Sequence, residues 1–436
     1  MIAVQPPAGN VAVILPIGYQ GGTLRLVLNV VRHFAARGVQ RLVFGVPAGH
    51  IATVHDDLAR LRRDLPVVEV RAFTWKTLDR SAARARAAEA GLEVGDFISD
   101  TYQLPIDEAS GFCDCDFWFF VSDRLEYPLV PLRPYGILVT DHLQRYVPEI
   151  FDLPMYQHQH AIPWNFLRNV RNADVVVSTS AATAADVASY SGALGRQLRM
   201  PTTIDIEYFQ RLASGPATTA DESPRQPYFV WVTNSSPHKN HLRMVRALRT
   251  YYESLGGSLD VRVTGLWTDL FDPDLPEARI GPRRGIYDLP YVREVREAVR
   301  TLLGPWRDRV HLLGAVPDAE YVRIVRESRF LLHNVLADNG TFSVVEAGIL
   351  GRPAVSSDYP QMREIDANFG LGLRFFDPCD EAATAAALLE GEQLPAPAAD
   401  ALVASIARRS WRTWDDAIVA AIGEILAEPR RPIAFL

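Results

Sequence analysis

The sequence predicts two consecutive α/β domains, each built on a doubly wound parallel sheet. Its 436 residues are too many for one ordinary hydrophobic core. Short β-branched runs alternate with amphipathic stretches along most of the chain, which is the pattern of βαβ units. A polar segment without periodicity, residues 213–227, divides this pattern into two series, so we interpret it as a linker between domains.

Each series supplies its own strands. We expect strands in the first series at 11–17, 41–46, 66–70, 116–121, 136–140 and 174–178, and in the second at 228–233, 259–264, 309–313, 329–333 and 353–357. Helices fill the intervals; residues 239–252, for example, carry one apolar face made of Leu242, Val245, Leu248 and Tyr252. The expected domains are therefore 1–212 and 228–409. Loops at the carboxyl ends of their strands would face a central cleft, the default place for a binding site.

The composition restricts the class of protein. With 45 Lys and Arg against 52 Asp and Glu, the net charge of −7 offers no attraction for a nucleic-acid backbone, so we expect no nucleic-acid partner. The apolar run 11–17 is too short for a signal-peptide core or a membrane span, and no later run is long enough. The odd number of cysteines (Cys113, Cys115 and Cys379) argues against a disulfide framework and favours a cytoplasmic location.

A glycine-rich turn follows the first expected strand. Residues 18–23 read Gly-Tyr-Gln-Gly-Gly-Thr and precede a long helix. Gly21 and Gly22 at such a turn would let the backbone approach a phosphate or a sugar closely, or they could simply form a tight turn. The segment is not the G-x-G-x-x-G pattern, which argues against a dinucleotide-dependent dehydrogenase.

The second series begins with a strand that ends near a lysine. Only Lys76 and Lys239 are lysines in this chain, and the other 43 basic residues are arginines, so a lysine at a particular position needs a reason. We expect Lys239 to begin the helix after the segment 233–240. There its ammonium could hold a diphosphate as a point charge beside helix N–H groups. The alternative is a solvated lysine at a helix start.

The most specific segment is 336–348, which follows a buried strand and opens a helix. Gly340 and Thr341 lie where free N–H groups could bind phosphate. Asp338 in the loop and Glu346 inside the helix are separated by seven residues. Two carboxylates at the entrance of one binding site suit a hydroxyl-rich ligand, because each can accept hydrogen bonds from neighbouring hydroxyls. Alternatively, Asp338 caps the helix and Glu346 is an ordinary helix residue, although Glu346 would be costly to bury without a partner.

Together these motifs resemble the retaining glycosyltransferases with the GT-B fold, specifically the large family numbered four, which includes many bacterial mannosyl- and glucosyltransferases. The resemblance runs through most of the chain. Residues 19–22 resemble the family's glycine loop, 233–240 its Pro-x-Lys-Asn segment, 310–321 its nucleobase pocket and 351–355 the segment after its paired acidic residues. Ser410-Trp411 opens a segment, 410–436, resembling the final helix that crosses back to the first domain.

The resemblance implies a donor site and a reaction. It assigns donor binding to Gly21, Gly22, Asn234, Lys239, Val316, Asn339, Gly340, Thr341 and Glu346, and catalysis to Lys239, Asp338, Asp141 and His142. The reaction would transfer a hexose, with mannose favoured, from a GDP- or UDP-linked donor to a hydroxyl of a glycan, lipid-linked or small-molecule acceptor, as in bacterial polysaccharide biosynthesis. No cofactor and no metal are expected. Peripheral contact with the inner face of the membrane stays open.

The chain departs from the family pattern at several positions. Asp338 replaces the first glutamate of the pair, Thr341 a glycine, and Asn234 an arginine that often accompanies the lysine on the diphosphate. Asp141-His142 has the reverse order of the family's His-Asp pair near the transferred sugar. A nucleotide-sugar epimerase of the same fold and a non-catalytic sugar-binding protein are the alternative functions.

Three further features have plain structural interpretations. Asp114-Cys115-Asp116 mimics a metal-binding D-x-D motif but adjoins an aromatic strand. Cys113 and Cys115 could bind zinc only with two more ligands, which the sequence does not indicate. The arginine-rich stretch 279–309 is expected to form a solvated helix face rather than an acceptor or membrane site.

Overall fold

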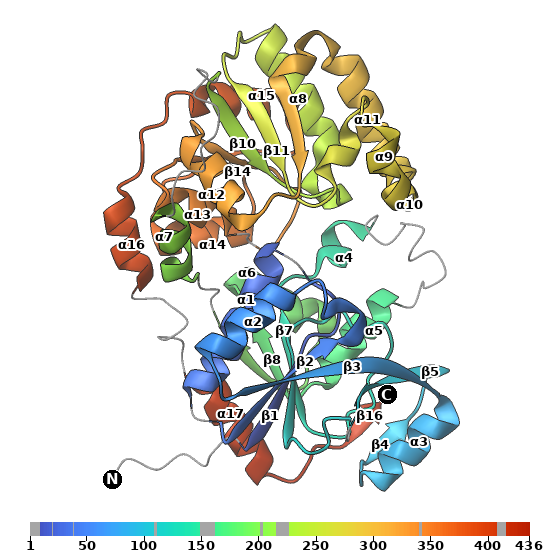
Figure 1. Ribbon diagram of the computed structural model, residues 1–436. Helices are drawn as coiled ribbons and strands as arrows, with labels where there is room; N and C mark the ends of the chain where they lie inside the picture. Colours follow the sequence, from blue (N-terminus) through green and yellow to red (C-terminus); the bar gives the residue numbers. More distant parts are fainter. Residues whose placement is uncertain are drawn as a thin grey trace. The chain divides into compact units, whose positions relative to one another are not determined.

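The computed structural model describes residues 9–19, 21–37, 39–108, 111–148, 162–200, 204–214, 226–339, 342–407 and 416–436. These residues form two compact units, coloured along the chain in Figure 1. The first unit contains the described residues up to His142, those from 162 to Ile204, and 416–436. The second contains 143–148 and the described residues from Asp205 to 407. Both units are α/β structures, which confirms the predicted fold class.

The first unit is built on an eight-stranded sheet with the order β5-β3-β2-β1-β6-β7-β8-β9. All neighbouring strands are parallel except β3 and β5, which are antiparallel. The six predicted strands are present, whereas β5 and β9 were not predicted. The bounds are β1 Asn10–Ile14, β2 Arg41–Pro47, β3 Val68–Asp79, β5 Thr101–Asp107, β6 Phe117–Phe120, β7 Tyr135–Val139, β8 Val175–Ser178 and β9 Arg196–Arg199.

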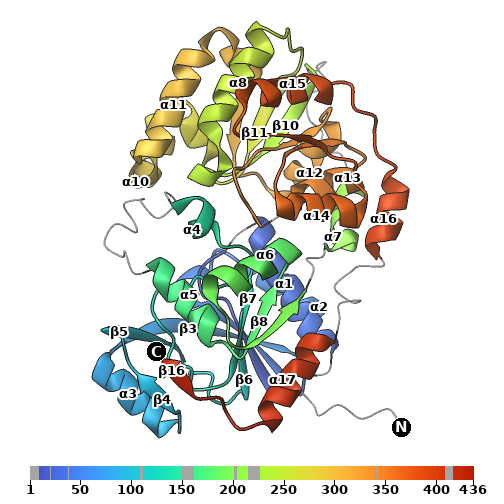
Figure 2. The ribbon, with the colours of Figure 1, turned by 180° about the vertical axis from the view of Figure 1, so that it is seen from behind.

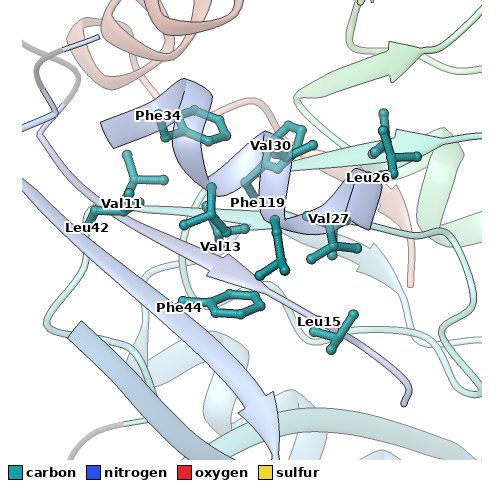
Figure 3. Packing of buried hydrophobic residues seen from close by; sticks show 14 of the residues in the cluster. Val11, Val13, Leu15, Leu26, Val27, Val30, Phe34, Leu42, Phe44 and Phe119 are labelled. Carbon is teal, nitrogen blue, oxygen red and sulfur yellow. The ribbon is translucent and has the colours of Figure 1, made fainter. Parts of the chain in front are cut away.

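Helices pack against both faces of this sheet. Because side chains alternate along a strand, Val11 and Val13 of β1 contribute to one apolar layer, with α1, and Ala12 and Ile14 to another. Figure 3 shows the first layer, in which Phe34 of α1 meets strand residues of the sheet. The helices are α1 Gly21–Ala36, α2 His55–Asp64, α3 Arg80–Glu89, α5 Ile162–Asn172 and α6 Ala181–Asp186, the last followed by a π-helical turn, Val187–Ser191.

The last part of the chain belongs to the first unit. Helix α17 (Ala417–Ala427) packs beside β8 and β9, as Figure 2 shows, and Ile418 and Ile422 enter the apolar layer of α1. Strand β16 (Ile433–Phe435) then pairs with β4 (Val94–Asp96) in a separate two-stranded parallel sheet. The expected start of the final helix at Ser410-Trp411 lies outside the described residues.

The second unit contains a fully parallel six-stranded sheet with the order β12-β11-β10-β13-β14-β15. This order reverses between β10 and β13, and such a switch point opens a crevice at the carboxyl ends of the two strands. The five predicted strands are present; β15 was not predicted. The bounds are β10 Tyr228–Val232, β11 Asp260–Thr264, β12 Val310–Gly314, β13 Leu331–His333, β14 Ala354–Ser357 and β15 Arg374–Phe376.

The helices of the second unit enclose a core around β10. Phe229 and Trp231 are buried there with Leu248 and Tyr251 of the helix that follows. The bounds are α4 Leu143–Tyr146, α7 Ile206–Ser214, α8 His241–Glu253, α9 Glu277–Ile280, α10 Arg284–Tyr287, α11 Pro290–Leu302, α12 Asp318–Glu327, α13 Ser343–Ile349, α14 Pro360–Phe369, α15 Glu381–Gly391 and α16 Ala399–Ala407.

Two boundaries differ from the sequence analysis. Helix α7, which the sequence placed at the end of the first domain, packs on α12 and α16 of the second unit, and the Tyr208 hydroxyl donates to the Asp318 carboxylate. The predicted helix 239–252 begins at His241, because Asn240 adopts a left-handed conformation with φ 57°. Lys239 therefore does not begin the helix; it ends the preceding 3₁₀ turn η4 (Pro237–Lys239).

Candidate functional site

Two predicted site residues pair with each other at the switch point of the second unit. Lys239 follows β10 and Asp338 follows β13, and the Lys239 ammonium donates to the Asp338 carboxylate. Only 8% and 7% of the two side chains are exposed. Burial by itself would raise the pKa of Asp338, but the Lys239 ammonium outweighs it and holds that pKa well below its usual value. The site therefore contains a buried ion pair.

Backbone contacts fix the turn that presents Lys239. The Asn334 Nδ2 lies 3.4 Å from the carbonyl oxygen of Lys239 and 3.3 Å from that of Asn240, and donates to both. The side-chain Nδ2 of Asn240 donates to the Pro378 carbonyl oxygen at 2.7 Å. The Leu336 N–H donates to the His238 carbonyl at 2.8 Å, which ties the loop of Asp338 to the loop of Lys239.

Two buried histidines adjoin this pair. His241 bonds through Nδ1 to the Tyr291 hydroxyl at 2.9 Å, and His333 bonds through Nε2 to the Tyr359 hydroxyl at 3.0 Å. Burial lowers the pKa of His241 to about 3, with His238 and Lys239 adding to the effect. Burial, with Lys239, also lowers the pKa of His333 to about 3. Both imidazoles are therefore neutral near pH 7.

The Asn234 side chain, at the position where the resembled glycosyltransferases often have an arginine, stabilises its own turn. Its Oδ1 accepts from the Ser236 N–H at 3.0 Å, an arrangement in which an asparagine side chain closes a local turn. Gly265, which follows β11, lies against Thr233 at the end of β10. A Cβ added to Gly265 would lie 1.5 Å from the Thr233 carbonyl oxygen. Asn234 contributes no charge, so it does not replace the family's second cation.

Glu346 lies inside α13 and is only 3% exposed. Its Oε2 accepts from the Tyr321 hydroxyl of α12 at 2.5 Å. Tyr321 therefore supplies the partner that burial of this carboxylate requires. Val316 is half-buried in the loop between β12 and α12, the helix that carries Tyr321.

The rest of the predicted acidic loop is described only in part. The Asn339 N–H donates to the Asp338 Oδ1 at 2.7 Å, and the N-cap of α13 is Phe342. Asp338 therefore does not cap this helix. Gly340 and Thr341, predicted to bind phosphate, lie outside the described residues.

Replacing Glu346 by glutamine is expected to weaken the binding of a sugar nucleotide while the protein stays folded. Glutamine keeps an oxygen that can accept from Tyr321 but cannot accept two hydrogen bonds from a ribose diol as a carboxylate does. Isothermal titration with UDP-glucose and GDP-mannose measures the affinity, and thermal unfolding measures stability. Tyr321→Phe is the control, since it removes only the internal bond. Loss of folding with unchanged nucleotide affinity would contradict the proposed contact.

The first unit also gathers polar side chains at its switch point, between β1 and β6. The Tyr19 hydroxyl after β1 lies 2.6 Å from the Ser122 hydroxyl after β6. Gly21 and Gly22 open α1 and are exposed, which agrees with the predicted helix after a glycine turn. A Cβ added to Gly18 would lie 2.7 Å from the His50 Nδ1, so this glycine is required for close packing.

Asp141 and His142 are linked through Arg124 and Asp123, since the Arg124 Nε also lies 3.6 Å from an oxygen of Asp123. Asp141 accepts from Arg124 at 2.8 Å, whereas the His142 Nδ1 lies 3.6 Å from an oxygen of Asp123. His142 and Asp123 are at most 1% exposed. Burial tends to raise the pKa of Asp123, but Arg124 and His142 outweigh it, so that this pKa is lowered. Asp123 and Arg124 were not predicted, although they directly follow the aromatic strand β6 that the sequence identified.

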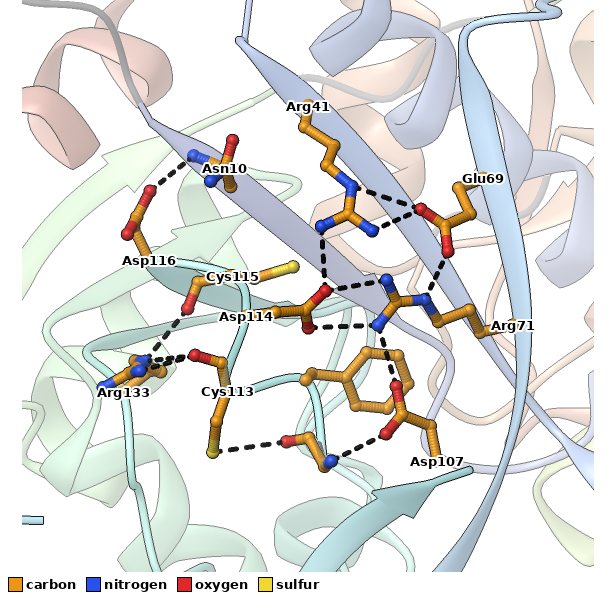
Figure 4. Close-up of polar contacts among 12 residues, drawn as sticks. Asn10, Arg41, Glu69, Arg71, Asp107, Cys113, Asp114, Cys115, Asp116 and Arg133 are labelled. Carbon is orange, nitrogen blue, oxygen red and sulfur yellow. Dashed lines mark hydrogen bonds and ion pairs between the residues drawn. The ribbon is translucent and has the colours of Figure 1, made fainter. Parts of the chain in front are cut away.

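The Cys-Asp-Cys-Asp segment lies at the opposite, amino-terminal edge of the first sheet (Figure 4). Asp114 accepts from Arg41 and Arg71 at 2.7–3.0 Å, and Asp116 accepts from the Asn10 N–H at 2.8 Å. The two aspartates of the D-x-D pattern thus hold a loop against the sheet. Burial raises the pKa of both Cys113 and Cys115, which lowers the fraction of reactive thiolate near pH 7. Among the described residues, no group of three metal-ligating side chains occurs.

Many arginines of the stretch 279–309 have internal partners. Asp269, a buried aspartate, accepts from both Arg279 and Arg283 at 2.7–2.9 Å. Arg296 covers the Tyr287 ring at 3.5 Å, and Arg307 pairs with Asp272 at 2.6 Å. These contacts stabilise the surface of the second unit. Among the described residues, no helix combines the length and apolar character needed to cross a bilayer.

Comparison with solved structures identifies proteins that share this fold. No family model matches the chain, and no curated protein matches its sequence. HepE of Anabaena, solved with UDP and glucose, is 14% identical, with a TM-score of 0.57 over 96% of this chain and 98% of that one. A UDP-forming α,α-trehalose-phosphate synthase from Burkholderia xenovorans is 12% identical, with a TM-score of 0.57 over 97% and 100%. At such low identity the likeness shows the fold, the two Rossmann-like domains of GT-B proteins.

Proposed function

We propose that this protein is a retaining glycosyltransferase that moves a hexose from a nucleotide diphosphate sugar to an acceptor hydroxyl. The observation that supports it best is the buried Lys239–Asp338 pair at the switch point of the second sheet. The similar structure of Anabaena HepE was also solved with UDP-glucose, at 15% identity. A GDP- or UDP-linked donor fits the proposal, with mannose or glucose as the sugar.

The second unit would bind the donor. Lys239 would stabilise the charge that develops on the departing diphosphate, a preorganised electrostatic role. Asp338 would accept hydrogen bonds from the sugar hydroxyls, and Glu346 from the ribose diol. Val316, Asn234, Asn339, Gly340 and Thr341 complete the proposed donor site.

The first unit would supply the acceptor side. Asp123 lies beside His142, so it would orient that imidazole toward a sugar, while Arg124 neutralises Asp141. Gly21 and Gly22 would let the backbone approach the ligand. The proposed acceptors are a glycan, a lipid-linked sugar or a small molecule of bacterial polysaccharide biosynthesis, used in the cytoplasm or at the inner face of the membrane.

A panel of sugar nucleotides tests the function. The protein is incubated with UDP-glucose, GDP-mannose and dTDP-glucose, with and without glucose, glucose 6-phosphate and mannose as acceptors. Release of nucleoside diphosphate together with a new glycoside would support a transferase. Interconversion of the sugar nucleotides would indicate an epimerase, and binding without turnover a sugar-binding protein. The anomeric configuration of the product, read by NMR, tests retention.

Activity is expected to persist in excess chelator. In the proposed site Lys239 and backbone N–H groups, rather than a metal, neutralise the phosphates. Initial rates with and without EDTA measure this, and a mock-treated sample is the control. A rate that falls in EDTA and returns with added magnesium or manganese would contradict the proposal.

A further inference from the structure

We propose that Asp338 promotes release of the nucleoside diphosphate product by competing with its terminal phosphate for the Lys239 ammonium. This inference rests on the proposed function and adds a step to it. It depends on the direct contact between the two side chains and on the neutral groups that surround them.

The ion pair itself carries no net charge. Lys239 and Asp338 carry opposite charges, are in direct contact and are both buried. His241 and His333 are neutral near pH 7, and Asn234 has no charge. A diphosphate that enters must therefore share the ammonium with a carboxylate that already holds it.

Donor and product differ in the charge that they place beside this carboxylate. In the sugar nucleotide the outer phosphate is esterified and carries one negative charge, and the sugar offers hydroxyl donors to Asp338. In the free product the outer phosphate is a terminal group that carries about −1.5 to −2 at pH 7. The product also lacks the hydroxyl donors. Asp338 therefore opposes the product more strongly than the donor.

The expected size of this preference follows from the charges. One extra unit charge a few ångströms from a buried carboxylate, at the effective dielectric constant typical of proteins, changes a binding constant by about tenfold or more. Removing the carboxylate charge should erase the preference and tighten product binding relative to donor binding.

Asp338→Asn tests this with nearly the same shape. Its amide oxygen can still accept from Lys239, whereas its Nδ2 takes the place of the oxygen that accepts from the Asn339 N–H. Isothermal titration gives Kd for UDP, UDP-glucose, GDP and GDP-mannose. The ratio of donor Kd to product Kd is expected to rise about tenfold or more in Asp338→Asn. Asp338→Glu, which keeps the charge, is the matched control and should retain the wild-type ratio.

The outcomes separate the two proposals. An unchanged or lower ratio in Asp338→Asn, with both ligands still bound, would overturn the release role and leave the transferase proposal standing. Binding of no nucleotide by the wild-type protein would overturn both.

The pH dependence of product binding provides a second test. The outer phosphate of UDP gains its second charge near pH 6. Lys239 attracts this charge and Asp338 opposes it. Between pH 5.5 and 7.5, the affinity of UDP relative to UDP-glucose should therefore rise more steeply in Asp338→Asn than in the wild-type protein, and equal slopes would contradict the inference. His238, the nearby histidine whose Nδ1 bonds to the Ser236 hydroxyl at 2.8 Å, is the same in both proteins, so the difference between their slopes reports on Asp338. Asp338 keeps its charge in this range, and His241, His333 and Tyr291 stay neutral.

Discussion

Replacing Lys239 by alanine is expected to lower kcat on the order of 10²–10³-fold, as removal of one preorganised donor does elsewhere. The ammonium would meet full charge only as the diphosphate departs, so the loss should appear chiefly in kcat rather than in KM. Lys239→Arg should be nearly as damaging, because a larger, planar guanidinium would replace a compact ammonium in a buried position and would present its donors in a different geometry. Steady-state kinetics of both variants provide the measurement.

The structure changes the expected effect on stability. Loss of a solvated lysine at a helix start, the alternative that the sequence left open, would cost little stability, but Lys239 and Asp338 are buried. Lys239→Ala leaves the Asp338 charge without its main partner, which typically costs about 3–5 kcal/mol of unfolding free energy. Combining Lys239→Met with Asp338→Asn should recover much of that stability without recovering activity. Thermal unfolding measures both effects.

Lys76→Ala is the matched control, since Lys76 is the other lysine and is exposed on β3. It should change neither kcat nor stability appreciably. Near-normal turnover of Lys239→Arg would show that only charge is needed. Near-normal turnover of Lys239→Ala would remove this residue from the site.

Gly265→Ala is expected to unfold the second unit or to destabilise it by more than about 4 kcal/mol. The added Cβ would lie 1.5 Å from the Thr233 carbonyl oxygen, an atom of a neighbouring strand end that cannot rotate away. The backbone at Gly265 has φ 137°, which L-residues rarely adopt. Urea unfolding followed by tryptophan fluorescence reports on this region, because Trp231 is buried in β10.

Gly256→Ala separates backbone strain from steric overlap. Gly256 also has a positive φ, 68°, but a Cβ there meets nothing within 4 Å. A cost of roughly 1–2 kcal/mol is expected from the left-handed conformation alone. Equal stability losses in the two variants would show that the contact with Thr233 is not the cause.

Much of the fold was predictable because its parallel strands are nearly continuous apolar runs. The segments 116–121 and 228–233, for example, correspond to β6 and β10, which are buried. The strands that were missed lack this signal. Strand β5 contains Pro105 and lies at the edge of its sheet, and β9 reads Arg-Gln-Leu-Arg. Neither segment is therefore a continuous apolar run in the sequence.

The sequence indicated single residues of the candidate site but not the contacts between them. Strand ends and helix starts indicated Lys239 and Asp338, but the motifs assigned the two residues to different parts of the ligand. Their contact arises because β10 and β13, far apart in the chain, are neighbours in the sheet. The contact of Glu346 with Tyr321 likewise joins two helices whose packing no local pattern encodes.

The return of the chain to the first unit has a consequence for biosynthesis. All six strands of the second sheet lie between Tyr228 and Phe376, so that sheet is fully translated before α17 and β16 leave the ribosome. The first unit, although most of it is made earlier, still lacks the helix that packs beside β8 and β9 and the strand that pairs with β4. A nascent chain arrested before Ala417 would therefore present an uncovered apolar surface on its first unit, where a chaperone would bind, while the core of its second unit is already complete.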